Sequence, residues 1–154
     1  EGLDATGNGI GLPTSFCVGA ALNPGADNVK GEVHRFHRKV EAGARWVQTQ
    51  PVYDLATLER FLDLAGGSPV PVIVGVMPLH SFRHAEFLHN EVPGIMVPEA
   101  VRERLRAAGD QALRVGIEIA QELVQAIRSR YAGVYLMPSF GRFEVVAEVL
   151  DALP

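Results

Sequence analysis

Three polar side chains able to bind a ligand stand together where a short β-branched and aromatic segment ends. Gln50, Tyr53 and Asp54 flank Pro51, and a proline cannot donate the next hydrogen bond of a strand ladder. In parallel α/β proteins, ligands bind outside the carboxyl ends of the strands, which predicts a substrate contact at Gln50. The same amide could instead satisfy only the backbone of its own loop, and position does not choose between these interpretations.

Metal binding and nucleophilic catalysis find less support. His80 and His84 have the spacing of a metal-binding pair on a helix, but no cysteine cluster or acidic group completes a ligand set, so we expect no metal. Solvent-facing or N-terminal helix positions explain these histidines. Ser15 and Ser139 lack a recognisable His and Asp arrangement, and Cys17, within a predicted strand, is explained as a small core residue.

Composition narrows the classes of protein and of partner. The 154 residues suffice for one domain with a core, and 47% hydrophobic with 21% charged residues is ordinary for a globular protein. Lys and Arg number 14 against 18 Asp and Glu, without a basic block, so nucleic acid is not an expected partner. No apolar run approaches the ~20 residues of a membrane span, and the single cysteine cannot form an internal disulfide. We therefore expect a cytoplasmic protein that binds no membrane.

Apolar segments alternate with amphipathic ones along the chain. We predict strands over 15–22, 45–50, 70–76 and 132–137. Helices are predicted over 29–42, 54–66, 81–90, 98–109 and 110–130 and from 143 onward, with Asp54, Ser81 and Asp110 as N-caps. The charged side chains of the first helix are those expected of a solvated face: Glu32, Arg35, Arg38, Lys39 and Glu41.

Each predicted strand ends beside a proline, at Pro24, Pro51, Pro78 or Pro138. The first three prolines are 27 residues apart (51 minus 24, and 78 minus 51), which indicates a repeated βα unit. Strands separated by helices must run parallel with right-handed crossovers, so the fold class is α/β with parallel βα repeats. A complete eight-stranded barrel usually takes ~250 residues. The chain therefore fits an open four-stranded sheet or half of a barrel, and the strand pattern does not decide.

Six motifs, taken together and in order, resemble methylenetetrahydrofolate reductase, and most closely the reductase half of bifunctional homocysteine S-methyltransferase/methylenetetrahydrofolate reductase proteins. They occupy 13–26, 39–44, 48–54, 75–79, 90–94 and 135–142. The resemblance implies the C-terminal half of a TIM (β/α)8 barrel, with 1–154 as one partial-barrel domain and 1–14 as a connector. The rest of the barrel would come from a missing N-terminal half or from a second copy of the chain.

The resemblance also implies a reaction, the reduction of 5,10-methylenetetrahydrofolate to 5-methyltetrahydrofolate by NAD(P)H, with FAD carrying the hydride. Gln50 matches the family glutamine whose amide bonds the pterin, an edge of donors and acceptors suited to an amide. Phe87 is the preferred position for the aromatic that stacks on the folate, with Phe82 as the other. The family's general acid lies on earlier strands, so we expect no catalytic residue in this chain and no activity from it alone.

The cofactor contacts that the resemblance implies fall on the first strand and the first helix. Lys39 matches a lysine near the FAD diphosphate, and Glu32 aligns with an acidic position that bonds the adenosine ribose. Ala20, Ala21 and Leu22 are expected beneath the isoalloxazine, although Leu22 stands where many members have a tyrosine. A hypothesis from another class is a non-catalytic half-barrel that binds a nucleotide-like ligand or a protein partner.

Overall fold

The computed structural model describes residues 2–151. Strands and helices alternate through this part of the chain, as predicted. Their order is β1 (Gly19–Leu22), α1 (Val29–Glu41), β2 (Trp46–Pro51), α2 (Leu55–Ala65), β3 (Val72–Val76), α3 (Phe82–Glu91), α4 (Glu99–Ala108), α5 (Ala112–Arg128), β4 (Gly133–Leu136) and α6 (Phe143–Asp151). Short 3-10 turns precede α5 (Gly109–Gln111) and α6 (Ser139–Gly141).

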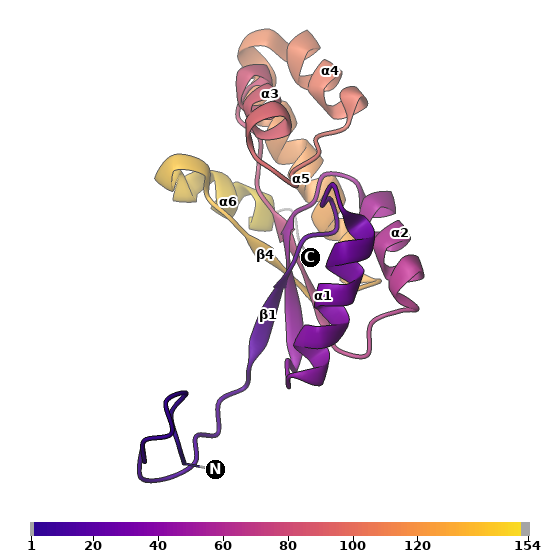
Figure 1. The fold of residues 1–154 in the computed structure, drawn as a ribbon. Coiled ribbons are helices and arrows are strands. Elements are labelled where there is room, and N and C mark those ends of the chain that lie inside the picture. The colour runs from indigo at the N-terminus through magenta and orange to yellow at the C-terminus, as the bar shows by residue number, and fades with distance from the viewer. Residues whose placement is uncertain (1, 152–154) are drawn as a thin grey trace.

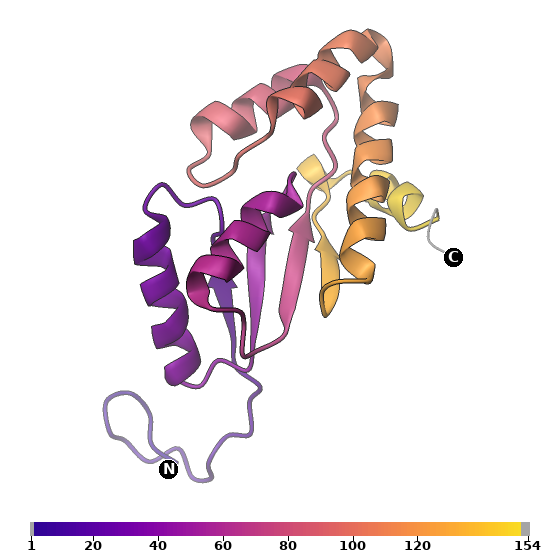
Figure 2. The ribbon, with the colours of Figure 1, turned by 90° about the vertical axis from the view of Figure 1, so that its right-hand side faces the viewer.

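The four strands form one parallel sheet in the order β1-β2-β3-β4, which confirms the predicted α/β class with parallel βα repeats. Strand order follows chain order without reversal, as in an arc of a (β/α)8 barrel and unlike a doubly wound sheet. Helices α1 and α2 lie on one side of the sheet, and α5 continues that layer (Figures 1 and 2). The opposite face of β1 and β2 is open.

The main core lies between the sheet and these helices. Side chains of β2 and β3 alternate, so that Val47 and Val74 point into the core and are fully buried. Phe36 of α1 and Phe61 of α2 meet edge to face, with 5.9 Å between ring centroids. Each helix thus buries the apolar stripe that its periodicity predicted.

A second, smaller core lies under α3 and α4, which stand above the carboxyl ends of the strands (Figures 1 and 2). Its buried members include Leu79 and Leu105. Here α5 passes so close to the loop after β3 that a Cβ built on Gly116 would lie 1.6 Å from the Leu79 carbonyl oxygen. Only glycine allows this contact, which sets how closely the loop after β3 packs against α5.

Two of the three predicted N-caps are confirmed. The Asp54 carboxylate accepts the backbone N–H of Ala56, and the Ser81 hydroxyl accepts that of His84. The prediction for Asp110 is wrong, because a 3-10 turn leads directly into α5 and leaves no extended residue for a capping side chain.

The first predicted strand was too long. The ladder with β2 begins at Gly19, opposite Trp46, and just before it the Val18 carbonyl accepts the Arg45 N–H at 2.7 Å. Residues 11–18 are exposed and without strand structure, so Cys17 is an exposed thiol rather than the core residue we expected. The segment before β1 projects from the sheet at the end opposite α3 and α4 (Figure 1).

None of the helices within residues 2–151 is both long and apolar enough to cross a bilayer.

Replacing Gly116 with alanine should destabilise the protein, although alanine is the better helix former. The new methyl group would collide with the Leu79 backbone, and overpacking of this kind typically costs about 1–3 kcal/mol. Urea unfolding of Gly116→Ala measures the cost. Gln125→Ala, at an exposed position of the same helix, is the matched control and should change stability little. A stabilised Gly116→Ala variant would contradict this prediction, because it would mean that the loop after β3 can move away from the new methyl group.

Candidate functional site

The candidate site lies on the open face of the sheet, near the rim formed by the carboxyl ends of the strands. Because all four strands are parallel, their carboxyl ends share this edge. A cavity of about 300 Å3 runs along the open face, from Gly19 and Trp46 at the amino ends of β1 and β2 to Gln50 near this edge. It is lined by Gly19, Ala20, Ala21, Trp46, Gln48, Thr49, Gln50 and Tyr135.

Strand β2 supplies the centre of this cavity. Trp46, Gln48 and Gln50 alternate with buried residues and point to the open face. Gln50 is exposed, and within residues 2–151 no hydrogen bond holds its side-chain amide. Its planar donor and acceptor groups are thus available to a ligand. The structure therefore does not tie this amide to its own loop, which was the competing interpretation.

Two aromatic side chains form the walls of the cavity by lying across glycines of neighbouring strands. A Cβ on Gly19 would meet the Trp46 ring at 2.3 Å, and one on Gly75 would meet the Tyr135 side chain at 2.7 Å. The alternation of β2 could have identified Trp46 and Gln48 from the sequence. Tyr135 could not have been found in that way, since Thr49, whose carbonyl accepts its hydroxyl, is 86 residues away.

Glu32 and Lys39, the two charged residues expected to contact the cofactor, both lie at the end of β1 and bond its backbone. Glu32 is buried, only 5% exposed, and its carboxylate accepts the Asn23 N–H at 3.2 Å and the Arg35 side chain at 2.8 Å. Lys39 donates to the Ala21 carbonyl at 2.7 Å and lies 3.6 Å from Glu32. Burial of Glu32 also corrects the prediction of a wholly solvated face on α1.

The small residues of β1 divide between the two faces of the sheet. Ala21 is exposed, and Ala20 and Ala21 both line the cavity. Leu22 is 1% exposed and belongs to the main core, so its side chain is not available to a planar ligand. Of the five residues expected at FAD, Ala21 is exposed in the cavity and Ala20 packs partly against the main core. Leu22 and Glu32 are buried, and Lys39 stays partly exposed beside them.

The two candidate aromatics on α3 have different surroundings. Phe87 is 51% exposed and borders a cavity of about 190 Å3 together with His80, Ser81, Arg83 and His84. Phe82 is half-buried, and the Arg106 guanidinium lies over its ring at 4.4 Å. Phe87 thus offers an open ring face, as a stacking role would require.

His80 and His84 stack on each other, with ring centroids 4.1 Å apart. Burial lowers the pKa of His84 to about 4, helped by repulsion from His80 and Arg142. The pKa of His80 is lowered mainly by burial and also by Arg142. His84 is at the helix N-terminus as expected, but it is buried rather than solvent-facing. Across residues 2–151, no three His, Cys, Asp or Glu side chains gather closely enough to hold a metal ion.

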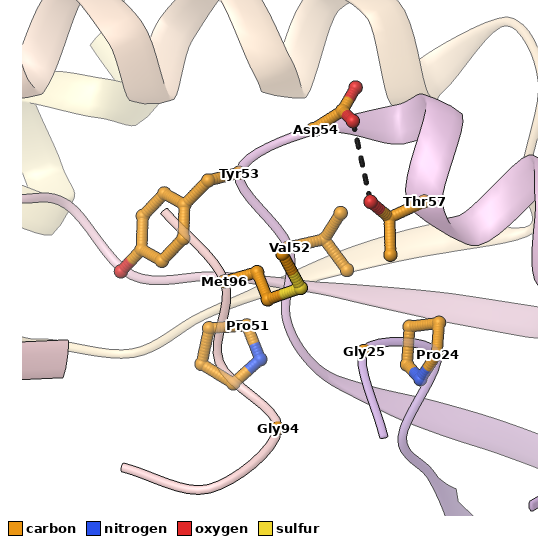
Figure 3. Close-up of a pocket in the computed structure, with 9 residues that line it drawn as sticks. All are labelled: Pro24, Gly25, Pro51, Val52, Tyr53, Asp54, Thr57, Gly94 and Met96. Carbon is orange, nitrogen blue, oxygen red and sulfur yellow. Dashed lines mark hydrogen bonds between the residues drawn. The ribbon is translucent and has the colours of Figure 1, made fainter. Parts of the chain in front are cut away.

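Figure 3 shows a second, much smaller cavity at the rim, between the turn after β1 and the end of β2. Its volume is about 10 Å3, close to the space of one water molecule. Gly94 closes it: a Cβ there would lie 1.9 Å from the Asn23 amide nitrogen. Asp54, beside it, is used as a helix cap and also bonds Thr57 at 3.3 Å. This is a packed joint between loops, with no room for a substrate.

Comparison with known proteins identifies the family to which the chain belongs. The family model described as methylenetetrahydrofolate reductase matches residues 13–153. The chain belongs to the methylenetetrahydrofolate reductase family. The resemblance inferred from the six motifs is thereby confirmed at the level of the family, while the likeness to the bifunctional proteins stays a prediction.

Curated relatives agree with this membership, and a solved structure shares the fold. The 5,10-methylenetetrahydrofolate reductases of Escherichia coli (strain K12) and Salmonella typhimurium are each 26% identical over 111 residues, which is 69% of this chain and 37% of theirs. The chain thus matches little more than a third of their length. A Clostridium thermocellum protein that binds two copies of 5-methyl-5,6,7,8-tetrahydrofolic acid has the same fold, with a TM-score of 0.58 and 20% identity. That match covers 89% of this chain and 52% of the other.

Glu32→Gln in this methylenetetrahydrofolate reductase family member should lower the free energy of unfolding by about 1–3 kcal/mol, because the negative charge and one of the two buried acceptor oxygens are lost. Chemical denaturation measures the loss. Glu41→Gln changes an exposed carboxylate of the same helix and should have little effect. Equal stability of both variants would contradict the assignment of Glu32 to the end of β1.

His84→Gln should flatten the dependence of stability on pH. The unfolded His84 binds its proton near pH 6.5 and the folded one only near pH 4, so the wild-type protein loses stability as pH falls through this window. One such proton contributes a slope of at most about 1.4 kcal/mol per pH unit. Urea unfolding at several pH values between 7 and 4 measures the slope. His34→Gln, at an exposed position, should keep the wild-type slope.

Proposed function

We propose that this chain is the folate-binding part of a methylenetetrahydrofolate reductase barrel, with Gln50 bonding the pterin. The observation that carries the proposal is the free, exposed amide of Gln50 in a cavity of about 300 Å3 on the open face of the sheet. Membership of the family supports it. The description of the Clostridium thermocellum protein, which shares the fold, as a binder of 5-methyltetrahydrofolate points in the same direction.

The chemistry of a pterin fits the residues around this amide. A pterin is flat and presents alternating hydrogen-bond donors and acceptors along one edge, which the oxygen and nitrogen of a glutamine amide can match. Its faces are suited to aromatic walls such as Trp46 and Tyr135. Phe87, with its exposed ring on α3, is the proposed contact for the more distant part of the folate.

The reaction proposed for the complete barrel is the reduction of 5,10-methylenetetrahydrofolate to 5-methyltetrahydrofolate by NAD(P)H. FAD would supply the hydride, and the surface that this chain offers it is Ala21 on the open face, with the partly buried Ala20 beside it. Leu22 and Glu32 are buried in the fold, whereas Lys39 is partly exposed beside them and stays the proposed contact for the FAD diphosphate. The general acid is assigned to the strands that precede this chain.

The remaining half of the barrel is a proposed partner. Strands β1 and β4 are each paired on one side only within residues 2–151, and their free edges can accept further strands. An N-terminal half-barrel or a second copy of the chain would complete the sheet and enclose the open face.

A second candidate function is folate binding without redox chemistry, by a non-catalytic half-barrel. The burial of Leu22 and Glu32 favours it, because two of the residues expected at FAD are then enclosed in the fold. Absorbance separates the two candidates. A yellow protein with a flavin spectrum supports the reductase, whereas a colourless protein that binds folate supports the second candidate.

Gln50→Ala should weaken the binding of 5-methyltetrahydrofolate by about tenfold or more, the effect of losing one or two hydrogen bonds to the ring edge. Isothermal titration calorimetry with the wild-type and variant chains measures it. Gln125→Ala, which removes an exposed amide far along α5, is the matched control and should bind as the wild type does.

Two results would contradict this proposal. Wild-type protein without measurable affinity for 5-methyltetrahydrofolate would remove folate as the ligand of the chain. Equal affinity of the wild type and Gln50→Ala would leave folate as a ligand but take Gln50 out of the site.

A further inference from the structure

Strand β2 contains an irregularity next to Gln50. Gln48 pairs with Ile73 and Pro51 with Gly75, so β2 uses three steps where β3 uses two (51 minus 48 against 75 minus 73). An extra residue of this kind bends a strand and changes the direction of its side chains, and such bulges often occur beside active sites. The backbone that carries Gln50 is thus not held by a regular ladder.

Two side chains take over the hydrogen bonds that the irregularity removes. The Thr49 hydroxyl accepts the Gly75 N–H at 2.9 Å, in place of a backbone carbonyl of β2, and donates to the Gln50 carbonyl at 2.7 Å. The Thr49 carbonyl accepts the hydroxyl of Tyr135 at 2.6 Å. Thr49 is 2% exposed, so these are bonds that water does not readily replace.

The bond from Tyr135 crosses an entire strand. Tyr135 belongs to β4, Thr49 belongs to β2, and β3 lies between them. The phenol can pass over β3 because residue 75 has no side chain: a Cβ there would lie 2.7 Å from the Tyr135 hydroxyl and 2.8 Å from its ring. Gly75 and Tyr135 therefore act as one unit that ties β4 to the irregular part of β2.

We propose that Tyr135 is a positioning residue that sets the direction of the Gln50 amide. By holding the Thr49 carbonyl, the phenol fixes the peptide from which Gln50 projects, while its ring forms a wall of the same cavity. This inference rests on the proposed function. If Gln50 bonds the pterin, the Tyr135 hydroxyl that positions it determines part of the affinity for the pterin edge. Hydrogen bonds depend on angle as well as distance. A small rotation of the Gln50 amide would therefore weaken the hydrogen bonds that it is proposed to make with the pterin edge.

A double-mutant cycle tests the coupling. Tyr135→Phe should weaken binding of 5-methyltetrahydrofolate by roughly 5- to 10-fold, the effect of one hydrogen bond. In the Gln50→Ala background the same change should have little further effect, because the amide that Tyr135 positions is gone. Tyr53→Phe is the matched control: it also removes a phenol bond to a backbone carbonyl, that of Met77 at 3.0 Å, but from the second core.

The unliganded protein provides a second readout that does not need folate. The side-chain NH2 signals of Gln50, assigned by their loss in Gln50→Ala, should shift in Tyr135→Phe and show faster motion by heteronuclear NMR relaxation. Gly75→Ala, which leaves the phenol in the sequence but displaces it, should give the same change. Tyr53→Phe should leave these signals as in the wild type.

The outcomes separate this inference from the proposed function. Gln50 signals that are unchanged in Tyr135→Phe would overturn the positioning role, whether or not folate binds. Additive losses of affinity in the double mutant would overturn it as well. Wild-type protein that fails to bind folate would contradict the proposed function only, and the NMR comparison would then decide the role of Tyr135 alone.

Discussion

Parallel pairing of the four strands is the constraint from which the candidate site follows. It requires a crossover helix after each strand and brings every carboxyl end to one rim. Because the main crossover helices cover one face, the side chains of the other face stay open, and in β2 these are an indole and two amides. An amphipathic strand of this kind suits a sheet whose second face meets a ligand or the rest of a barrel.

Stability and recognition are assigned to different residues along the same rim. Glu32 and Lys39 bond the backbone at the carboxyl end of β1, and Gly94 allows the loop after α3 to pack against Asn23. Gln50 stands between these packed segments with its amide unused. A rim that is rigid on both sides of a free polar group favours binding, because little conformational entropy is lost when the ligand arrives.

Prediction from sequence worked where the signal is local. The apolar periodicity located the helices, and Asp54 and Ser81 were identified as caps because a cap needs only a few neighbouring residues. It failed where contacts are distant in sequence. The apolar run around Cys17 is exposed and does not become a strand, and the place of buried Glu32 is fixed by contacts with Asn23 and Lys39. No pattern along the chain connects Tyr135 to Thr49.

The exposed position of Cys17 has a practical consequence for measurements of assembly. It is the single thiol of the sequence and stands just before β1, on a segment that projects from the sheet. Air oxidation can join two chains there by a disulfide, so a covalent dimer would form without any pairing of half-barrels. The same thiol offers one unique attachment point for a fluorescent or spin label, whose mobility would report when the neighbouring edge of the sheet becomes covered.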